Sequence, residues 1–297
     1  MTHSFSSEEE RVFFQEAFSR NKGLLTEAEQ ERLRQSTVAV AGLGGVGGIE
    51  AVGLARLGVG HFHLSDPDTF EVANFNRQAG AMMSTVGKQK AEVIMAMIHD
   101  INPFAQVKVW NTALDETSVG PFLDGADIVV DGIDFFAPKA RRLLYHAARE
   151  KGLFVVGAGP IGFGSALLVF DPKGMDFDTY FDIHDGMSEK DMTIYYGLGV
   201  TPSLLQRSYF RPEKIDFDKK SGASLSIGTF FAAGFVLTNV AKVLLGHPVS
   251  CAPASMHFDP YVEKLKRPWL LWGNRGLLQR IKIAVALFQI RKHEQDR

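Results

Sequence analysis

Residues 37–47 read TVAVAGLGGVG, a short apolar run that leads directly into a glycine-rich turn. A second apolar run at 61–65 is closed by an acidic residue, Asp66. Glycines allow a tight turn and let backbone N–H groups approach a phosphate, the following helix N-terminus favours negative charge, and an acidic side chain can accept from ribose hydroxyls. The stretch therefore predicts a nucleotide held at a helix N-terminus, although it does not say which nucleotide.

Short apolar runs alternate with helical patterns through the first half of the chain. The expected strands are 37–41, 61–65, 106–110, 128–131 and 153–158, with a later short strand near 256–258. The expected helices are 45–57, 87–101, 138–151 and 225–245. This order predicts an α/β fold with a doubly wound, mostly parallel, Rossmann-like sheet.

The chain divides into three parts on these signals. Residues 1–36 are charged and predicted to be helical, and 37–260 form the nucleotide-binding domain. Within that domain, 171–223 are polar, aromatic and weakly periodic, which favours a long crossover loop or lid. Residues 261–297 are expected to form a separate helical tail. The apolar run 224–246 is long enough for a membrane span, but Asn239 and Lys242 interrupt it, so a buried helix is favoured.

Composition narrows the classes of function. The 297 residues are 45% hydrophobic and 22% charged with a formal net charge of −2, so a folded core is expected and broad nucleic-acid binding is disfavoured. The one cysteine, Cys251, permits no internal disulfide and no C-x-x-C zinc site. The polar N-terminus carries no apolar signal core, so a cytoplasmic protein is expected.

A cluster of polar residues suits a triphosphate better than a hydride-transfer site. Arg77 and Lys90 can neutralise phosphate oxygens. Asp134 lies just past the end of the strand at 128–131, where open α/β sheets place ligands and where a carboxylate can hold Mg²⁺.

At this point the chain resembles the ThiF/MoeB/HesA adenylating enzymes, relatives of the ubiquitin-activating enzymes. The resemblance covers roughly residues 18–258. Its motifs are the glycine turn, D-x-D from Asp66, N-x-x-R-Q from Asn74, G-x-x-K ending at Lys90, D-x-x-D ending at Asp134, and KVLLG at 242–246. The motifs NFNRQ and DGIDFFAPK most resemble those of the branch that contains the tRNA threonylcarbamoyladenosine dehydratases.

The resemblance implies ATP- and Mg²⁺-dependent adenylation of a carboxylate by a homodimer. It assigns Asp134 as the magnesium-binding catalytic carboxylate, and Arg20 as the arginine that reaches the partner subunit's ATP. The implied nucleotide-binding residues are Gly42, Gly44, Gly45, Gly47, Asp66, Asn74, Arg77, Gln78 and Lys90. The acceptor is expected to be a carboxylate on a small molecule, a peptide C-terminus or a modified tRNA nucleoside.

The chain also departs from the family pattern. Members that pass their substrate to sulfur carry a cysteine on the crossover loop, whereas 171–223 contain none, and the zinc-binding cysteines of many members are missing, so no zinc is expected. Phe135 replaces the usual polar residue after the catalytic aspartate. Sulfur relay is therefore not expected, and the nucleophile that intercepts the adenylate is left open.

The sequence is also compatible with two other functions, and it leaves the role of the tail open. An NAD-dependent oxidoreductase can use the same glycine turn, and a nucleotide-bound, non-catalytic scaffold can recruit a partner through 171–223 or the tail. Residues 268–297 combine tryptophans, basic residues and an apolar helix, which suits a membrane surface or a partner groove. The alternative is a helix packed on the dimer or on its own domain.

Overall fold

A computed structural model of the chain describes residues 7–211 and 214–295. The parts of the predicted segments at 1–6, 212–213 and 296–297 lie outside the described residues. Within the described ranges, eight strands form one sheet in the order β3-β2-β1-β4-β5-β6-β7-β8. The strands are β1 (Thr37–Ala41), β2 (His61–Ser65), β3 (Gln106–Trp110), β4 (Ile128–Asp131), β5 (Phe154–Ile161), β6 (Gly164–Phe170), β7 (Met256–Asp259) and β8 (Lys264–Lys266).

The first five strands are parallel and the last three pairings are antiparallel. β2 and β3 extend the sheet to one side of β1, while β4 and β5 extend it to the other. The order therefore reverses between β1 and β4, and open sheets of this kind bind ligands beyond the carboxyl ends of the strands at such a point. The mostly parallel α/β sheet expected from the sequence is confirmed.

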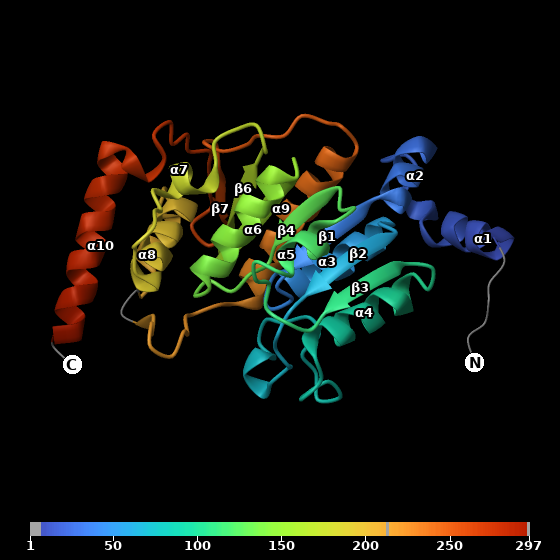
Figure 1. Cartoon of the computed structure of the whole chain (residues 1–297), viewed down its shortest axis with the longest axis horizontal. Coiled ribbons are helices and arrows are strands. Elements are labelled where there is room, and N and C mark those ends of the chain that lie inside the picture. The colour runs from blue at the N-terminus through green and yellow to red at the C-terminus, as the bar shows by residue number, and fades with distance from the viewer. Residues whose placement is uncertain (1–6, 212–213, 296–297) are drawn as a thin grey trace.

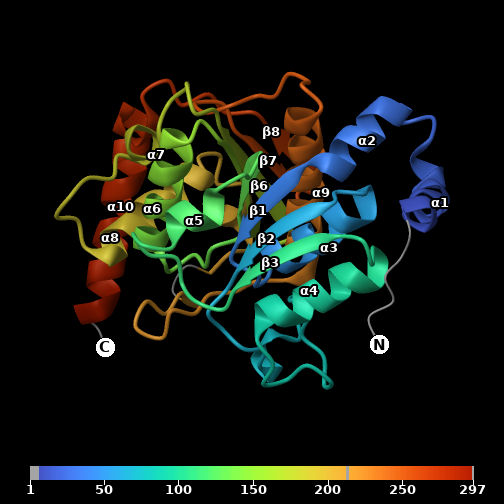
Figure 2. The same ribbon diagram turned by 45° about the vertical axis from the view of Figure 1, so that its right-hand side comes forward.

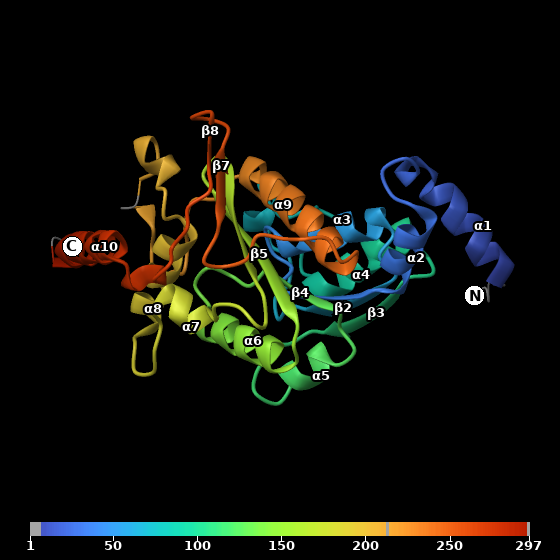
Figure 3. The ribbon, with the colours of Figure 1, turned by 90° about the horizontal axis from the view of Figure 1, so that it is seen from above.

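Helices cover both faces of the sheet (Figure 1). One face carries α3 (Gly47–Leu57), α4 (Lys90–Ile101) and α9 (Ser226–Leu244) over a core that includes Val40, Phe62 and Ile94. The other carries α5 (Val119–Leu123) and α6 (Pro138–Glu150) over a second core that includes Phe122 and Leu144. Figure 3 shows the two helix layers on either side of the sheet.

The first and last described helices lie at opposite ends of the molecule (Figure 1). The N-terminal segment contains α1 (Ser7–Ala17) and α2 (Glu27–Gln35), and Thr26 closes the start of α2 with a capping box to Glu29. Figure 2 shows these helices on the far side of the sheet from α10 (Leu277–Gln295).

The segment 171–223, predicted as a long crossover loop or lid, contains regular structure among its described residues. Its elements are α7 (Phe177–Phe181), α8 (Glu189–Val200) and the 3₁₀ turn η3 (Leu205–Ser208). Asp176 and Ser188 cap the two helices through Thr179 N and Asp191 N. Short helices carry little periodic signal, and the aromatic residues Phe177, Tyr180 and Phe181 are buried in the second core.

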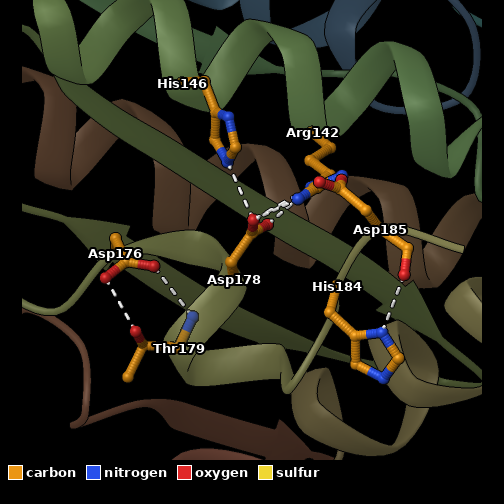
Figure 4. Close-up of polar contacts among 7 residues, drawn as sticks. All are labelled: Arg142, His146, Asp176, Asp178, Thr179, His184 and Asp185. Atoms are coloured by element: carbon orange, nitrogen blue, oxygen red, sulfur yellow. Dashed lines mark hydrogen bonds and ion pairs between the residues drawn. The ribbon is translucent and has the colours of Figure 1, made fainter. Parts of the chain in front are cut away.

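Ion pairs fasten α7 to α6 (Figure 4). The Arg142 guanidinium binds Asp178 at 2.6 Å and Asp185 at 2.6 Å, and His146 Nε2 lies 3.1 Å from the same Asp178 carboxylate. Asp176 accepts from the backbone N–H and the hydroxyl of Thr179 at 2.8 Å each. We interpret these contacts as structural, because each charged side chain is paired with another residue of the same region.

The C-terminal helix is present, and within the described residues the segment 261–295 is joined to the rest of the domain. β8 pairs with β7, and the turn before α10 is tied into the domain. Asn274 is fully buried and its amide donates to Phe181 O and Tyr195 O at 2.8 Å. Gln279 donates to Leu198 O and Lys282 to Pro202 O. Sequence could not show this docking, because it depends on backbone carbonyls of α7 and α8.

One described helix, α9, is long and apolar enough to cross a membrane by length and composition. It lies against β5, β6 and α3, and Ala232, Val236 and Val240 are buried in the first core. This placement fits the buried-helix interpretation of 224–246.

Candidate functional site

The glycine turn is shaped by backbone packing at three positions. Gly42 has φ +82°, a left-handed value that favours glycine. A Cβ on Gly42 would overlap the Gly132 carbonyl, and a Cβ on Gly47 would overlap the Gly42 carbonyl. Gly132 follows β4, so the ends of β1 and β4 and the start of α3 meet backbone to backbone. Gly42 and Gly47 are therefore explained by the fold itself.

Gly44 and Gly45 have no such explanation. A Cβ on Gly44 would meet only the Gln78 amide at 3.6 Å, and one on Gly45 would lie 3.5 Å from Thr229 and 3.8 Å from the Arg77 stem. These are ordinary van der Waals distances. Packing within the chain does not require glycine here, so the bare backbone at 44–45 is available for close approach by a ligand.

Asp66 is built into the base of the turn. Its carboxylate accepts from Leu43 N at 2.6 Å and from Asp68 N at 2.9 Å, and the residue is 4% exposed. Burial raises the pKa of Asp66, against the opposing effects of Lys90 and the two backbone donors. The side chain joins the end of β2 to the glycine turn. Asp66 therefore has a structural role in holding the turn, and its contact with a ribose stays a prediction.

Lys90 lies at the start of α4 and is paired in this structure. Its Nζ is 2.9 Å from Asp68, and the lysine side chain is 7% exposed whereas the Asp68 side chain is 64% exposed. Because Asp68 faces solvent and lies two residues from Asp66, the ammonium sits at the rim of the turn. A phosphate at this rim would compete with Asp68 for Lys90.

The segment 72–78 brings two of its three predicted residues to the turn. The Arg77 stem lies over Gly45, while its guanidinium donates to Ala73 O at 3.2 Å and to Asn76 Oδ1 at 2.9 Å. Gln78 is 7% exposed beside Gly44, and its buried Oε1 has no hydrogen-bond partner among the residues described. Asn74 instead closes the local turn η2 (Val72–Asn74) by accepting from Glu71 N.

Two aspartates at the end of β4 have different environments. Asp131 is buried against Arg141 at 2.8 Å and accepts from the Tyr145 hydroxyl at 2.9 Å, so both of these partners are within the protein. Asp134 is exposed, and one carboxylate oxygen accepts from Phe136 N at 2.8 Å. Gly132, two residues earlier, touches Gly42 and Gly47, so this loop lies beside the glycine turn.

Arg20 lies away from the turn of its own chain. It is exposed on η1 (Ser19–Asn21), and the neighbouring Asn21 donates to Leu57 O at the last residue of α3. α3 has 11 residues and begins at the glycine turn. A helix of this length separates its ends by about 16 Å. The predicted role of Arg20 therefore requires a second chain.

Glu50 and Thr229 were missed by sequence reasoning. Thr229, at the start of α9, lies beside Gly45. Glu50 is fully buried on α3, neither carboxylate oxygen has a partner among the described residues, and burial followed by Asp131 raises its pKa well above the usual value. The sequence signal was available only for Glu50, as an acidic residue inside an apolar helix.

Neither a thiol centre nor a protein-only metal cluster is indicated. Burial raises the pKa of the Cys251 thiol to about 11, with Asp171 adding to the effect, so thiolate is scarce near neutral pH. Among residues 7–211 and 214–295, no group of three or more metal-binding side chains is found. Asp134 can still supply one oxygen to Mg²⁺, an ion that usually takes its other ligands from phosphates and water.

Comparison with known proteins identifies the family. The model of the ThiF family matches residues 18–270. The chain belongs to the ThiF family. The resemblance noted from the motifs is thereby confirmed, and the match extends past the region expected from them.

Individual relatives match parts of the chain. A tRNA threonylcarbamoyladenosine dehydratase of Bacillus subtilis is 43% identical over 118 residues, which are 39% of this chain and 46% of that protein. The chain's matches span about half the length of such curated relatives.

Solved structures share the fold. The crystal structure of E. coli MccB with ATP has a TM-score of 0.60 at 20% identity, covering 91% of this chain and 72% of that one. The E. coli tRNA N6-threonylcarbamoyladenosine dehydratase TcdA has a TM-score of 0.57 at 21% identity, covering 82% and 98%.

Proposed function

We propose that the protein is an ATP-dependent adenylyltransferase that activates a carboxylate as an acyl-adenylate. The observation that carries this proposal is the bare backbone of Gly44 and Gly45, which chain packing does not require, beside Arg77 and Gln78 at the switch point of the sheet. Family membership and the fold shared with an ATP-bound MccB support it.

The reaction needs positioning and charge stabilisation rather than a general base. The substrate carboxylate is already ionised at neutral pH. One of its oxygens attacks the α-phosphorus, the bond from that phosphorus to the bridging oxygen breaks, and pyrophosphate leaves with the electron pair. No proton is moved in this step. Backbone N–H groups at 44–45 and the cations at 77 and 90 would hold the phosphates as charge shifts to the leaving group.

Asp134 is the residue we assign to Mg²⁺. Its exposed carboxylate keeps one oxygen free of the bond to Phe136 N, which fits an ion that takes few protein ligands. Bound there, Mg²⁺ would neutralise charge on the phosphates. Asp66 would accept from the ribose, and Gln78, whose amide oxygen is unpartnered, would contact the nucleotide near Gly44.

The acceptor is a carboxylate on a small molecule, a peptide C-terminus or a modified tRNA nucleoside. The single cysteine at 251 lies outside 171–223 and its thiol is protonated near neutral pH, so we propose interception of the adenylate by an amine, a hydroxyl or an internal nucleophile. We place the protein in the cytoplasm, where ATP is available, and assign it no zinc.

Pyrophosphate exchange tests this proposal. A screen over candidate carboxylates, including peptides and tRNA, should give acceptor-dependent exchange of labelled pyrophosphate into ATP. Asp134→Asn should abolish it, while Asp124→Asn, an exposed aspartate on the loop before β4, serves as the matched control. A thermal shift with NAD but not with ATP and Mg²⁺ would favour an oxidoreductase. ATP binding without exchange for any carboxylate would favour a scaffold.

We also propose a homodimer. Exposed apolar side chains lie on the two segments that bring Arg77 and Thr229 to the candidate site, namely Val72, Phe75, Met82, Met83, Val86, Leu225, Ile227 and Phe230. Asn76 donates to Ser224 O and joins the two segments that carry them. Such a patch suits an interface. If Arg20 acts across it, mixing inactive Arg20→Ala and Asp134→Asn proteins should restore part of the exchange activity; no recovery in mixed dimers would contradict this role.

A further inference from the structure

The C-terminal helix has two apolar faces, and only one of them is covered. Ile283 is 4% exposed and Gln279 is 2% exposed where α10 packs on α8. On the opposite face the large apolar side chains remain open to solvent. These are Leu277, Leu278, Ile281, Val285 and Phe288, which are 50–75% exposed. Soluble helices usually keep the outward face polar, so this face calls for a partner.

The segment that leads into α10 repeats the pattern. Trp269, Leu271 and Trp272 are 65%, 57% and 69% exposed. Tryptophan side chains with this exposure are costly in water and are favoured at the level of lipid headgroups, where one end of the ring is apolar and the other is hydrated. We call these three residues together with the five on α10 the C-terminal apolar surface.

The chain segment that carries this surface is rich in positive charge. Residues 261–290 carry six lysines and arginines and one acidic residue, Glu263, although the whole chain has a formal net charge of −2. Lys264, Lys266, Arg267 and Arg280 are exposed. Two copies meeting through the same face would bring these cations together, which disfavours self-association. An anionic surface would be attracted.

A cleft of about 490 Å³ lies between α8 and the flank of α10. Its lining includes Arg280, Tyr195 and the apolar Leu287, and also Asp182, which is held by Arg275 at 2.8 Å. No ion pair engages Arg280 within the described part of the chain. An arginine at the rim of a partly apolar cleft suits a phosphate headgroup with the first part of its acyl chain.

We propose that the C-terminal apolar surface docks the protein on an anionic lipid bilayer. α10 would lie in the interface rather than span it, because Asn274, Gln279 and Lys282 bind its other side to backbone carbonyls of the domain. Trp269 and Trp272 insert at headgroup depth, the apolar stripe of α10 rests on the acyl boundary, and the exposed cations contact lipid phosphates.

Flotation of the full chain with vesicles tests this proposal. The protein should float with vesicles that contain phosphatidylglycerol and stay unbound with phosphatidylcholine alone, and high salt should weaken the binding because it screens exposed charges. Ile281→Ser/Phe288→Ser and Trp269→Ala/Trp272→Ala should each reduce the apparent affinity by about tenfold or more. Val12→Ser/Leu24→Ser, at exposed apolar positions near the N-terminus, should bind as the unmodified chain does.

The contrary outcomes are distinct. Absence of flotation with anionic vesicles, which needs no variant, overturns the proposal. Equal losses in the N-terminal control and the α10 variant also overturn it. If sedimentation shows that Ile281→Ser/Phe288→Ser breaks a self-associated species and vesicles bind neither protein, the surface is an interface between copies instead. Binding of inorganic phosphate, measured at matched ionic strength, distinguishes a bilayer from a free anion. Only binding to the bilayer should be weakened by the substitutions of apolar residues.

Discussion

Alanine at Gly44 and at Gly47 should separate the function of the turn from its folding. A Cβ on Gly44 meets only the Gln78 amide at 3.6 Å, and no left-handed φ is found there. The free energy of unfolding should therefore change by less than about 0.5 kcal/mol. The methyl group would, however, displace a phosphate from the backbone N–H groups. Loss of one charge-assisted hydrogen bond costs about 1.5–3 kcal/mol, or roughly ten- to a hundredfold in ATP affinity.

Gly47→Ala should instead lower the stability of the fold. Its Cβ would overlap the Gly42 carbonyl, which is backbone and cannot rotate away. Overpacking of this kind costs about 1–3 kcal/mol, against a gain of about 0.5–1 kcal/mol from replacing glycine in a helix. A net loss of about 1 kcal/mol lowers Tm by about 2–4 °C in a chain of this size. Thermal unfolding and titration calorimetry with ATP and Mg²⁺ measure both effects. If Gly44→Ala retains full ATP affinity, the phosphates do not bind the backbone N–H groups at 44–45.

Three further predictions concern buried charges and the thiol. Asp131→Asn should cost about 3–5 kcal/mol in urea unfolding because it leaves Arg141 uncompensated in a buried pair; a cost near that of the exposed Asp134→Asn would contradict this. The raised pKa of Glu50 means that the folded protein binds a proton which the unfolded chain releases above its ordinary pKa of 4.5, so its stabilising effect is lost as pH rises above that value. The stability advantage of Glu50→Gln should thus grow from pH 5 to pH 8, and parallel curves would argue against a neutral Glu50. Cys251→Ser should keep full pyrophosphate exchange, and iodoacetamide should label Cys251 slowly at pH 7.5 because its pKa is about 11; loss of exchange in the serine variant would point to a thiol step.

Parallel strands and the glycine turn were readable from the sequence because their signals are local. The runs at 37–41, 61–65, 106–110 and 128–131 match β1 to β4 residue for residue. β1, β2 and β4 are short, mostly buried runs closed by turn residues, whereas β3 lies at the edge of the sheet and alternates polar with apolar residues. β5 continues to Ile161 and returns as β6, and this hairpin was not expected. Its apolar run at 164–170 follows β5 after two residues, and the alternation of strands with helices favoured a parallel crossover instead.

Contacts distant in sequence limited what could be predicted about the site. The motif residues Arg77 and Gln78 lie beside the turn. The hydrogen bond of Asp66 to Leu43 N and the pairing of Lys90 with Asp68 depend on loop geometry. The helices at 177–200 were missed because α7 is only five residues long and both helices pack their aromatic side chains on α6 and on one another. The docking of α10 depends on buried amides such as Asn274, which has no periodic signature.

The most direct test of the proposed activity is a crystal structure with a non-hydrolysable ATP analogue and Mg²⁺. Phosphate oxygens should lie within hydrogen-bonding distance of the backbone N–H groups at 44–45, with Arg77 and Lys90 turned toward the phosphates and Asp134 on the metal. A triphosphate bound elsewhere, or bound at the turn with these three side chains directed away from it, would contradict the proposed activity.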